Sequence, residues 1–165
     1  MFKKKEYVCA HLTHTMIYIW DIYFINFSEP NSFKHVFNVT IPADKLAKNY
    51  DRLRQLLDES GYDKSILVGP EVNHVGEYSH QGEEYAELFL TSQNRIVHYV
   101  TWHQYYLNGR EATVKDFIDP PVFNWLPIQI KSLGKSVAAS GKNVSMWLCM
   151  YFILELERVL SCQFI

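Results

Sequence analysis

The residue best placed to take part in a chemical reaction is Glu29, in the stretch FSEPNSFKHVF at residues 27–37. This carboxylate follows a run of aromatic and β-branched residues, precedes a proline, and is followed by side chains able to bind a polar ligand. A carboxylic acid at the end of a strand can protonate a leaving group as a general acid. Many ordinary strands also end in glutamate, so the position alone fits a catalytic or a structural role.

Other ionisable residues follow later apolar stretches. Glu71 comes after SILVG at 65–69, and His103 and Tyr105 lie toward the end of RIVHYVTWHQYY at 95–106. Ligands of parallel α/β sheets bind just beyond the carboxyl ends of strands, so these residues are expected at one edge of a sheet. No G-x-G-x-x-G or G-x-x-x-x-G-K-S/T is present, which argues against a Rossmann or P-loop nucleotide site.

The elements that must position these residues alternate along the chain. Dense β-branched and aromatic stretches predict strands at 17–27, 65–69, 95–106 and 143–148. Helices are predicted at 43–60, 82–93 and 115–140, the last interrupted by prolines. The first helix has an apolar face made of Leu46, Tyr50, Leu53, Leu56 and Leu57. The alternation predicts one α/β domain of 165 residues with a parallel sheet.

Composition argues against several classes of function. A net charge of -2 gives no overall attraction to nucleic acid or anionic lipid, so a polyanion site must be local. The 3 cysteines lack C-x-x-C spacing and the 7 histidines are scattered, so neither a disulfide framework nor a metal site is predicted. No cofactor is expected.

The apolar stretches do not predict a membrane span or a clear signal peptide. Polar residues interrupt the N-terminal stretch, and no small-residue cleavage site follows it. The stretch at 146–154 is shorter than the ~20 residues that a membrane helix needs. Sequons of the N-x-S/T type, which fit a glycoprotein of the secretory pathway, occur at Asn26, Asn38 and Asn143.

Three motifs together resemble the heparanase family, the endo-β-glucuronidases that cut heparan sulfate. They are SEPNSFKH at 28–35, VGPEV at 68–72 and the very specific VTWHQYYLNGR at 100–110, in this order. The likeness runs from about Trp20 to Leu148, so residues 1–19 and 149–165 diverge from the family pattern. The resemblance implies a partial (β/α)8 TIM barrel, to which this chain supplies about four parallel strands with intervening helices.

The resemblance also implies a role for individual residues. Glu29 matches the acid/base glutamate, which would protonate the glycosidic oxygen as the bond breaks. His103 and Tyr105 match positions beside the sugar, and Arg110 matches a basic residue facing sulfate or carboxylate groups. The remaining residues expected to form an anion-binding rim follow the acid directly: Lys34 and His35.

Two positions depart from the family pattern. Ser28, also expected to bind substrate, stands where the family has an asparagine, and a hydroxyl offers fewer hydrogen bonds than an amide. The family's nucleophilic glutamate belongs to W-L-G-E-T, whereas here Trp147-Leu148 is followed by Cys149-Met150-Tyr151. Retaining hydrolysis needs two carboxyl groups, so the isolated chain is expected to be close to inactive.

Three functional interpretations stay open. The first is an incomplete heparanase-like glycoside hydrolase, active only if the remaining barrel strands are supplied by a longer chain. The second is a non-catalytic pseudoenzyme that binds heparan sulfate or a related glycosaminoglycan. The third is a ligand-free interaction fragment. The resemblance implies an extracellular or lysosomal location.

Overall fold

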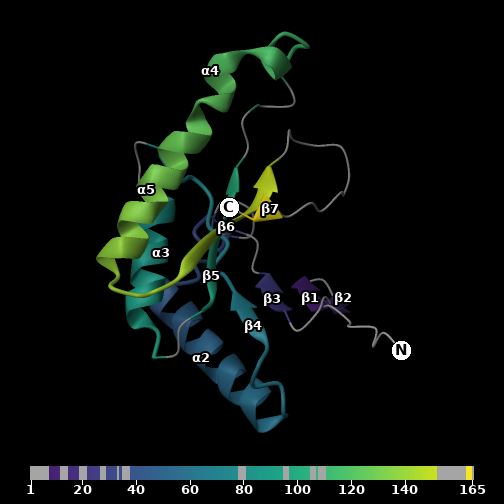
Figure 1. Ribbon diagram of the computed structural model, residues 1–165, viewed down its shortest axis with the longest axis vertical. Helices are drawn as coiled ribbons and strands as arrows, with labels where there is room; N and C mark the ends of the chain where they lie inside the picture. The colour runs from purple at the N-terminus through teal and green to yellow at the C-terminus, as the bar shows by residue number, and fades with distance from the viewer. Residues whose placement is uncertain are drawn as a thin grey trace.

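The chain forms a sheet of seven strands in the order β2-β1-β3-β4-β5-β6-β7, shown in a computed structural model in Figure 1. The structure describes residues 8–11, 15–18, 22–26, 29–32, 34, 38–77, 81–94, 97–104, 107, 111–151 and 163–164. The strands are β1 (Val8–His11), β2 (Thr15–Tyr18), β3 (Ile22–Asn26), β4 (Ile66–Val68), β5 (Tyr99–Gln104), β6 (Ser145–Tyr151) and β7 (Gln163–Phe164). The helices are α2 (Ala43–Glu59), α3 (Gln81–Ser92), α4 (Pro120–Phe123) and α5 (Trp125–Ala139), with a 3-10 turn η1 (Asp116–Ile118).

The centre of the sheet is parallel. β1, β3, β4, β5 and β6 pair in parallel, whereas β2 and β7 pair antiparallel with β1 and β6 at the two edges. The prediction of an α/β fold with parallel strands is therefore confirmed. The prediction of a single strand over 17–27 is wrong, because Thr15–Tyr18 and Ile22–Asn26 are separate strands that both pair with β1.

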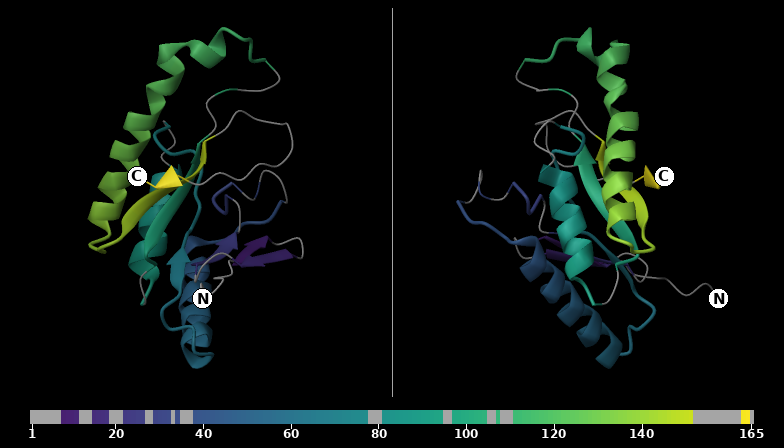
Figure 2. Two further views of the ribbon diagram at one scale, coloured as in Figure 1. Left: turned by 45° about the vertical axis from the view of Figure 1, so that its right-hand side comes forward. Right: turned by 90° about the vertical axis from the view of Figure 1, so that its left-hand side faces the viewer.

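The helices lie on one face of the sheet. Figure 2 shows α2, α3 and α5 side by side over the strands, while α4 and the start of α5 extend beyond the sheet. Among the described residues, no helix is long and apolar enough to cross a membrane. Pro127 falls in the first turn of α5, where an amide hydrogen has no partner within the helix, so a proline is tolerated there.

The core is packed between α2, α3 and the central strands. Leu46 and Tyr50 from α2 are 1% exposed, and the Tyr50 ring meets Phe89 of α3 edge to face at 5.0 Å. Fully burying each such side chain contributes roughly 2 kcal/mol. Leu56 was expected on this apolar face but is 43% exposed, because the helix turns that position toward solvent.

Two contacts of α2 hold the strand that leads to the site. The buried Arg54 guanidinium donates to the carbonyls of Tyr62 and Ser65 at 2.6 Å, which fixes the turn into β4. The Tyr50 hydroxyl donates to the carbonyl of Val68 at 3.2 Å and packs on Gly69, which has a φ of +156°. The end of β4 is thereby tied to the core.

Candidate active site

Two glutamates lie at the carboxyl ends of neighbouring strands. Glu29 follows β3, and Glu71 follows β4 after a cis Gly69-Pro70 peptide bond. Both have a left-handed backbone, with φ values of 56° and 62°, which is uncommon for residues other than glycine. The amide of Glu29 donates to the carbonyl of Glu71 at 3.2 Å. This bond helps to offset the conformational cost of both turns.

A reciprocal pair of asparagine contacts joins the same two segments. The side-chain amide of Asn31 donates to the Asn73 carbonyl at 3.0 Å, and the Asn73 backbone amide donates to Asn31 Oδ1 at 3.1 Å. Together with the bond between the glutamates, these contacts hold the turn at 29–32 against the segment at 71–73. The relative position of the two carboxylates therefore depends on backbone groups as well as side chains.

His103, near the end of β5, lies between the two glutamates. Its Nδ1 is 3.2 Å from Glu29 Oε1, and its Nε2 is 2.6 Å from Glu71 Oε1. Its backbone amide donates to the Val72 carbonyl at 2.8 Å, and the pairing of β5 with β6 is irregular between Trp102 and His103. Such irregularities re-aim a side chain at the end of a strand. Here the histidine is turned into the site.

Glu29 is the more accessible of the two carboxylates. Its side chain is 22% exposed, compared with 8% for Glu71 and 4% for His103. The Asn73 side-chain amide donates to Glu29 Oε2 at 2.8 Å and also to the Ser32 hydroxyl oxygen at 2.8 Å. Glu29 is therefore oriented on two sides while part of it still faces solvent.

The charge of His103 follows from its position. Burial lowers the pKa of the imidazole, but the charge of Glu71 and the hydrogen bonds to Glu29 and Glu71 outweigh it and raise the pKa to about 9. The raised pKa favours the doubly protonated ring at neutral pH, in which each ring nitrogen donates to one of the two carboxylates. The site is then a cation held between two anions.

This arrangement fits acid–base chemistry at Glu29 better than chemistry shared by two carboxylates. A partly exposed carboxyl group held by hydrogen bonds can exchange a proton with a bound ligand. Glu71 cannot act as the opposing carboxylate of a hydrolytic pair, because the imidazole occupies the space between it and Glu29. That space would have to hold a water or a sugar carbon.

The neighbouring strand contributes no second carboxyl group at this position. The pairing of β5 with β6 sets His103 opposite Met150 and Gln104 opposite Tyr151. The sequence Cys149-Met150-Tyr151 therefore stands beside the site at the end of β6.

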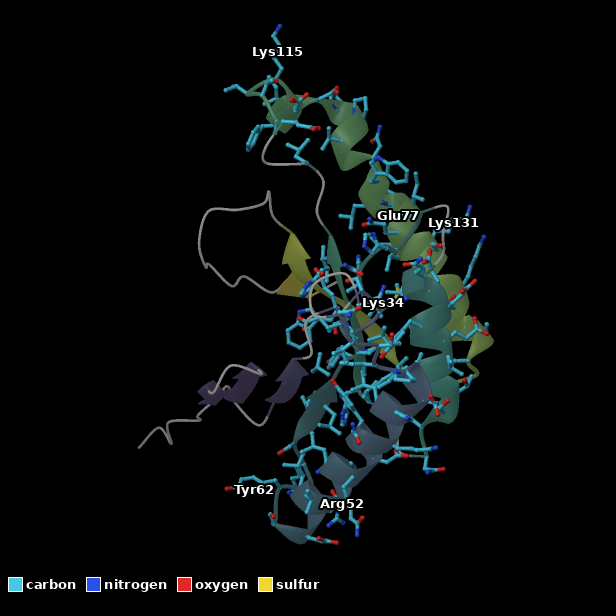
Figure 3. All side chains as sticks on the ribbon, turned by 180° about the vertical axis from the view of Figure 1, so that it is seen from behind. Lys34, Arg52, Tyr62, Glu77, Lys115 and Lys131 are labelled. Atoms are coloured by element: carbon cyan, nitrogen blue, oxygen red, sulfur yellow. The ribbon has the colours of Figure 1, made fainter. Side chains whose placement is uncertain are left out.

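The expected proximity of strand-end residues is observed for Glu29, Glu71 and His103. Lys34 is exposed, and its side chain forms no hydrogen bond or ion pair within the described residues. In Figure 3 it lies between Lys115 at one end of the molecule and Arg52 at the other. The other predicted binding residues lie outside the described part of the chain: Ser28, His35, Tyr105 and Arg110.

Three residues of the site were not predicted. Asn31, Ser32 and Asn73 orient Glu29 and its turn, although the first two stand within the quoted SEPNSFKH motif. Their signal was the density of short polar side chains directly after two strand ends, where such residues bond to nearby backbone groups. The sequence predicts the position of Glu71 at a strand end, but not a role for it in the site.

A shallow hollow on α2 lies apart from the site and includes none of its residues. It is lined by Lys48, Asp51, Arg52, Gln55 and Asn94.

Comparison with known proteins gives a consistent set of relatives. None of the protein-family models compared matches the chain. Heparanase of Bos taurus is 32% identical over 121 residues, which cover 73% of this chain and 22% of that protein. Heparanase of Gallus gallus is 32% identical over 122 residues, covering 73% and 23% of the two chains. "Inactive heparanase-2" of Homo sapiens is 26% identical over 122 residues, covering 73% and 20%. The chain is therefore heparanase-like, and it spans about a fifth of the length of the heparanases that it matches, 22% for the bovine protein.

Proposed function

We propose that this chain carries the acid/base residue, and the strand ends around it, of a heparanase-like glycoside hydrolase built on a (β/α)8 barrel. The proposed ligand is heparan sulfate or a related glycosaminoglycan, and the proposed acid/base is Glu29. The observation that supports this best is the contact of Glu29 with His103 at the carboxyl end of parallel strands, in a chain of which 73% aligns with bovine heparanase.

The geometry suits a proton transfer to a glycosidic oxygen. Glu29 is partly exposed, so it can reach a bound glycan, and Asn73 and His103 fix the direction of its two oxygens. A glycosidic oxygen leaves readily only when it is protonated as its bond breaks. Ser28, Lys34, His35, Tyr105 and Arg110 are proposed to bind the sugar and its anionic groups.

The chain alone is proposed to be close to inactive. Retaining hydrolysis needs a nucleophilic carboxylate about 5 Å from the acid, and β6 ends in Cys149-Met150-Tyr151 instead. General acid catalysis alone gives roughly 10²–10⁴-fold acceleration, which is far below that of typical enzymes at roughly 10⁶-fold or more.

A non-catalytic glycan-binding protein is the second candidate function. It is supported by the same missing carboxylate and by the match to a relative named inactive heparanase-2. Such a protein would keep the exposed cation Lys34 and the polar edge while lacking turnover. In this case Glu29 would bind sugar hydroxyls as an acceptor.

The two candidates and the inactivity are tested on the purified chain with end-labelled heparan sulfate oligosaccharides. We expect binding that weakens as salt rises, measured by calorimetry, and no shortening of the oligosaccharides on sizing columns. Lys34→Ala is expected to weaken binding several-fold. Lys131→Ala, which removes an exposed lysine from α5, is the matched control and is expected to leave affinity unchanged.

Each result has a defined meaning. Shortened oligosaccharides would contradict the proposed inactivity and favour the first candidate. Absence of binding at low salt would contradict both candidates. Equal losses of affinity from Lys34→Ala and Lys131→Ala would show that the attraction is non-specific and that Lys34 has no particular part in binding the oligosaccharides.

A further inference from the structure

Glu71 has no part in the proposed proton transfer, yet it makes the closest contact in the site. Its Oε1 lies 2.6 Å from His103 Nε2, whereas Glu29 Oε1 lies 3.2 Å from Nδ1. The Glu71 side chain is 8% exposed. A buried carboxylate is costly unless a cation or several donors balance its charge.

His103 is the group that balances this charge. Within the described residues, the second carboxylate oxygen of Glu71 is buried and forms no hydrogen bond. The side chain therefore acts on the site through the imidazole. The Glu71 backbone contributes separately, since its carbonyl accepts the amide of Glu29.

We propose that Glu71 is a positioning residue that keeps His103 doubly protonated, and that this imidazolium holds Glu29 Oε1 in place through a charged hydrogen bond from Nδ1. The inference rests on the proposed function, because Glu29, the group that His103 holds in place, is the proposed acid/base. It assigns no direct contact between Glu71 and the substrate.

The contacts of the ring explain why it would stay charged. The imidazolium retains its proton to a higher pH, because two carboxylates from different segments face it: Glu29 after β3 and Glu71 after β4. Asn73 and Ser32, the other described side chains bonded to Glu29, are neutral.

The test is an imidazole ¹⁵N NMR titration of the full chain, with His103 assigned by His103→Gln. In the wild type we expect His103 to stay doubly protonated to about pH 9. In Glu71→Gln we expect its midpoint to fall by more than one unit, roughly a tenfold change in proton affinity. Glu77→Gln, which removes the carboxylate beside the exposed His74, is the matched control and should leave His103 unchanged.

Several results would overturn the inference. A wild-type midpoint near 6.5 would do so without any variant, so the test holds even if Glu71→Gln fails to fold. An unchanged midpoint in Glu71→Gln would do the same. Heparan sulfate binding measured on the same samples separates the two proposals: binding with an ordinary His103 midpoint rejects this inference alone. A raised midpoint without binding rejects the proposed function and leaves the positioning of His103 by Glu71 standing.

Discussion

At the scale of single residues, the site is organised by the balance of one cation against two anions. His103 is 4% exposed and has carboxylates on both ring nitrogens. Removing the Nε2 proton from the ring would leave the buried Glu71 carboxylate without its donor, which is costly. The same contacts that hold the protons on His103 should therefore also contribute to the stability of the fold.

This coupling predicts that stability depends on pH through His103. Its pKa in the folded chain is about 9, above the value of about 6.5 expected after unfolding. The raised pKa contributes stability that is fully present below pH 6.5 and is lost as the pH rises through about 9. We expect a loss of up to roughly 3 kcal/mol over this range, measured by urea denaturation. His103→Gln should flatten the profile, and parallel profiles for both proteins would contradict the assignment.

The orientation of Glu29 gives a second prediction at this scale. Asn73→Ala removes the amide that bonds Glu29 Oε2 and Ser32, and Asn73 is 6% exposed. Because hydrogen bonds to charged groups contribute roughly 1.5–3 kcal/mol when buried, we expect about 2 kcal/mol of destabilisation in chemical denaturation. Asn94→Ala removes a similar amide–carboxylate bond to Asp51 at an exposed position and should cost less than about 1 kcal/mol. Equal losses would show that burial does not set the strength of the Asn73 contact.

At the scale of elements, close packing of helices on the strand-end segments positions the site. Gly82, in the first turn of α3, lies directly against the Asn73 carbonyl and the Val75 side chain. Glu83 follows it, and its Oε1 accepts the Gly76 amide at 2.7 Å. The start of α3 therefore holds the segment that carries Asn73.

A pair of glycine substitutions tests this packing. Gly82→Ala would place a methyl group against the Asn73 carbonyl, so the 71–76 segment has to shift, and we expect at least about 2 kcal/mol of destabilisation. Gly134→Ala, in α5, meets only Met146 at 3.7 Å and should stabilise the chain by up to about 1 kcal/mol. Thermal unfolding compares both, and the His103 NMR signal should move only in Gly82→Ala. A neutral Gly82→Ala would contradict the role of this contact.

The sequence predicted the elements better than the contacts that complete the site. Helical spacing identified α2 and α3, and apolar runs identified β4, β5 and β6, because these patterns are local. Glu29 and His103 were found through their motifs at strand ends. Asn73 was missed because its role depends on a turn 44 residues away, which no local pattern specifies. The division of 17–27 into two strands was missed because both parts have the same composition.

At the scale of the whole molecule, the sheet is parallel in its centre and has antiparallel strands at its edges. β7 pairs with β6 through Trp147 with Phe164 and Leu148 with Gln163. Gln163 and Phe164 thus cover part of the edge of β6, the strand that stands beside His103. An uncovered strand edge is a template for pairing with another chain.

Removal of this cover gives the last prediction. A chain that ends at Tyr151 lacks β7, so the backbone groups of Trp147 and Leu148 that face β7 lose their partners. We expect this variant to associate through β6 in a concentration-dependent manner, measured by sedimentation velocity. Deletion of residues 1–7, which precede β1, is the control and should leave the association state unchanged. Association of the truncated chain should also bury the edge beside His103 and weaken oligosaccharide binding. A truncated chain that stays in the association state of the full chain and binds with full affinity would show that β7 does not protect this edge.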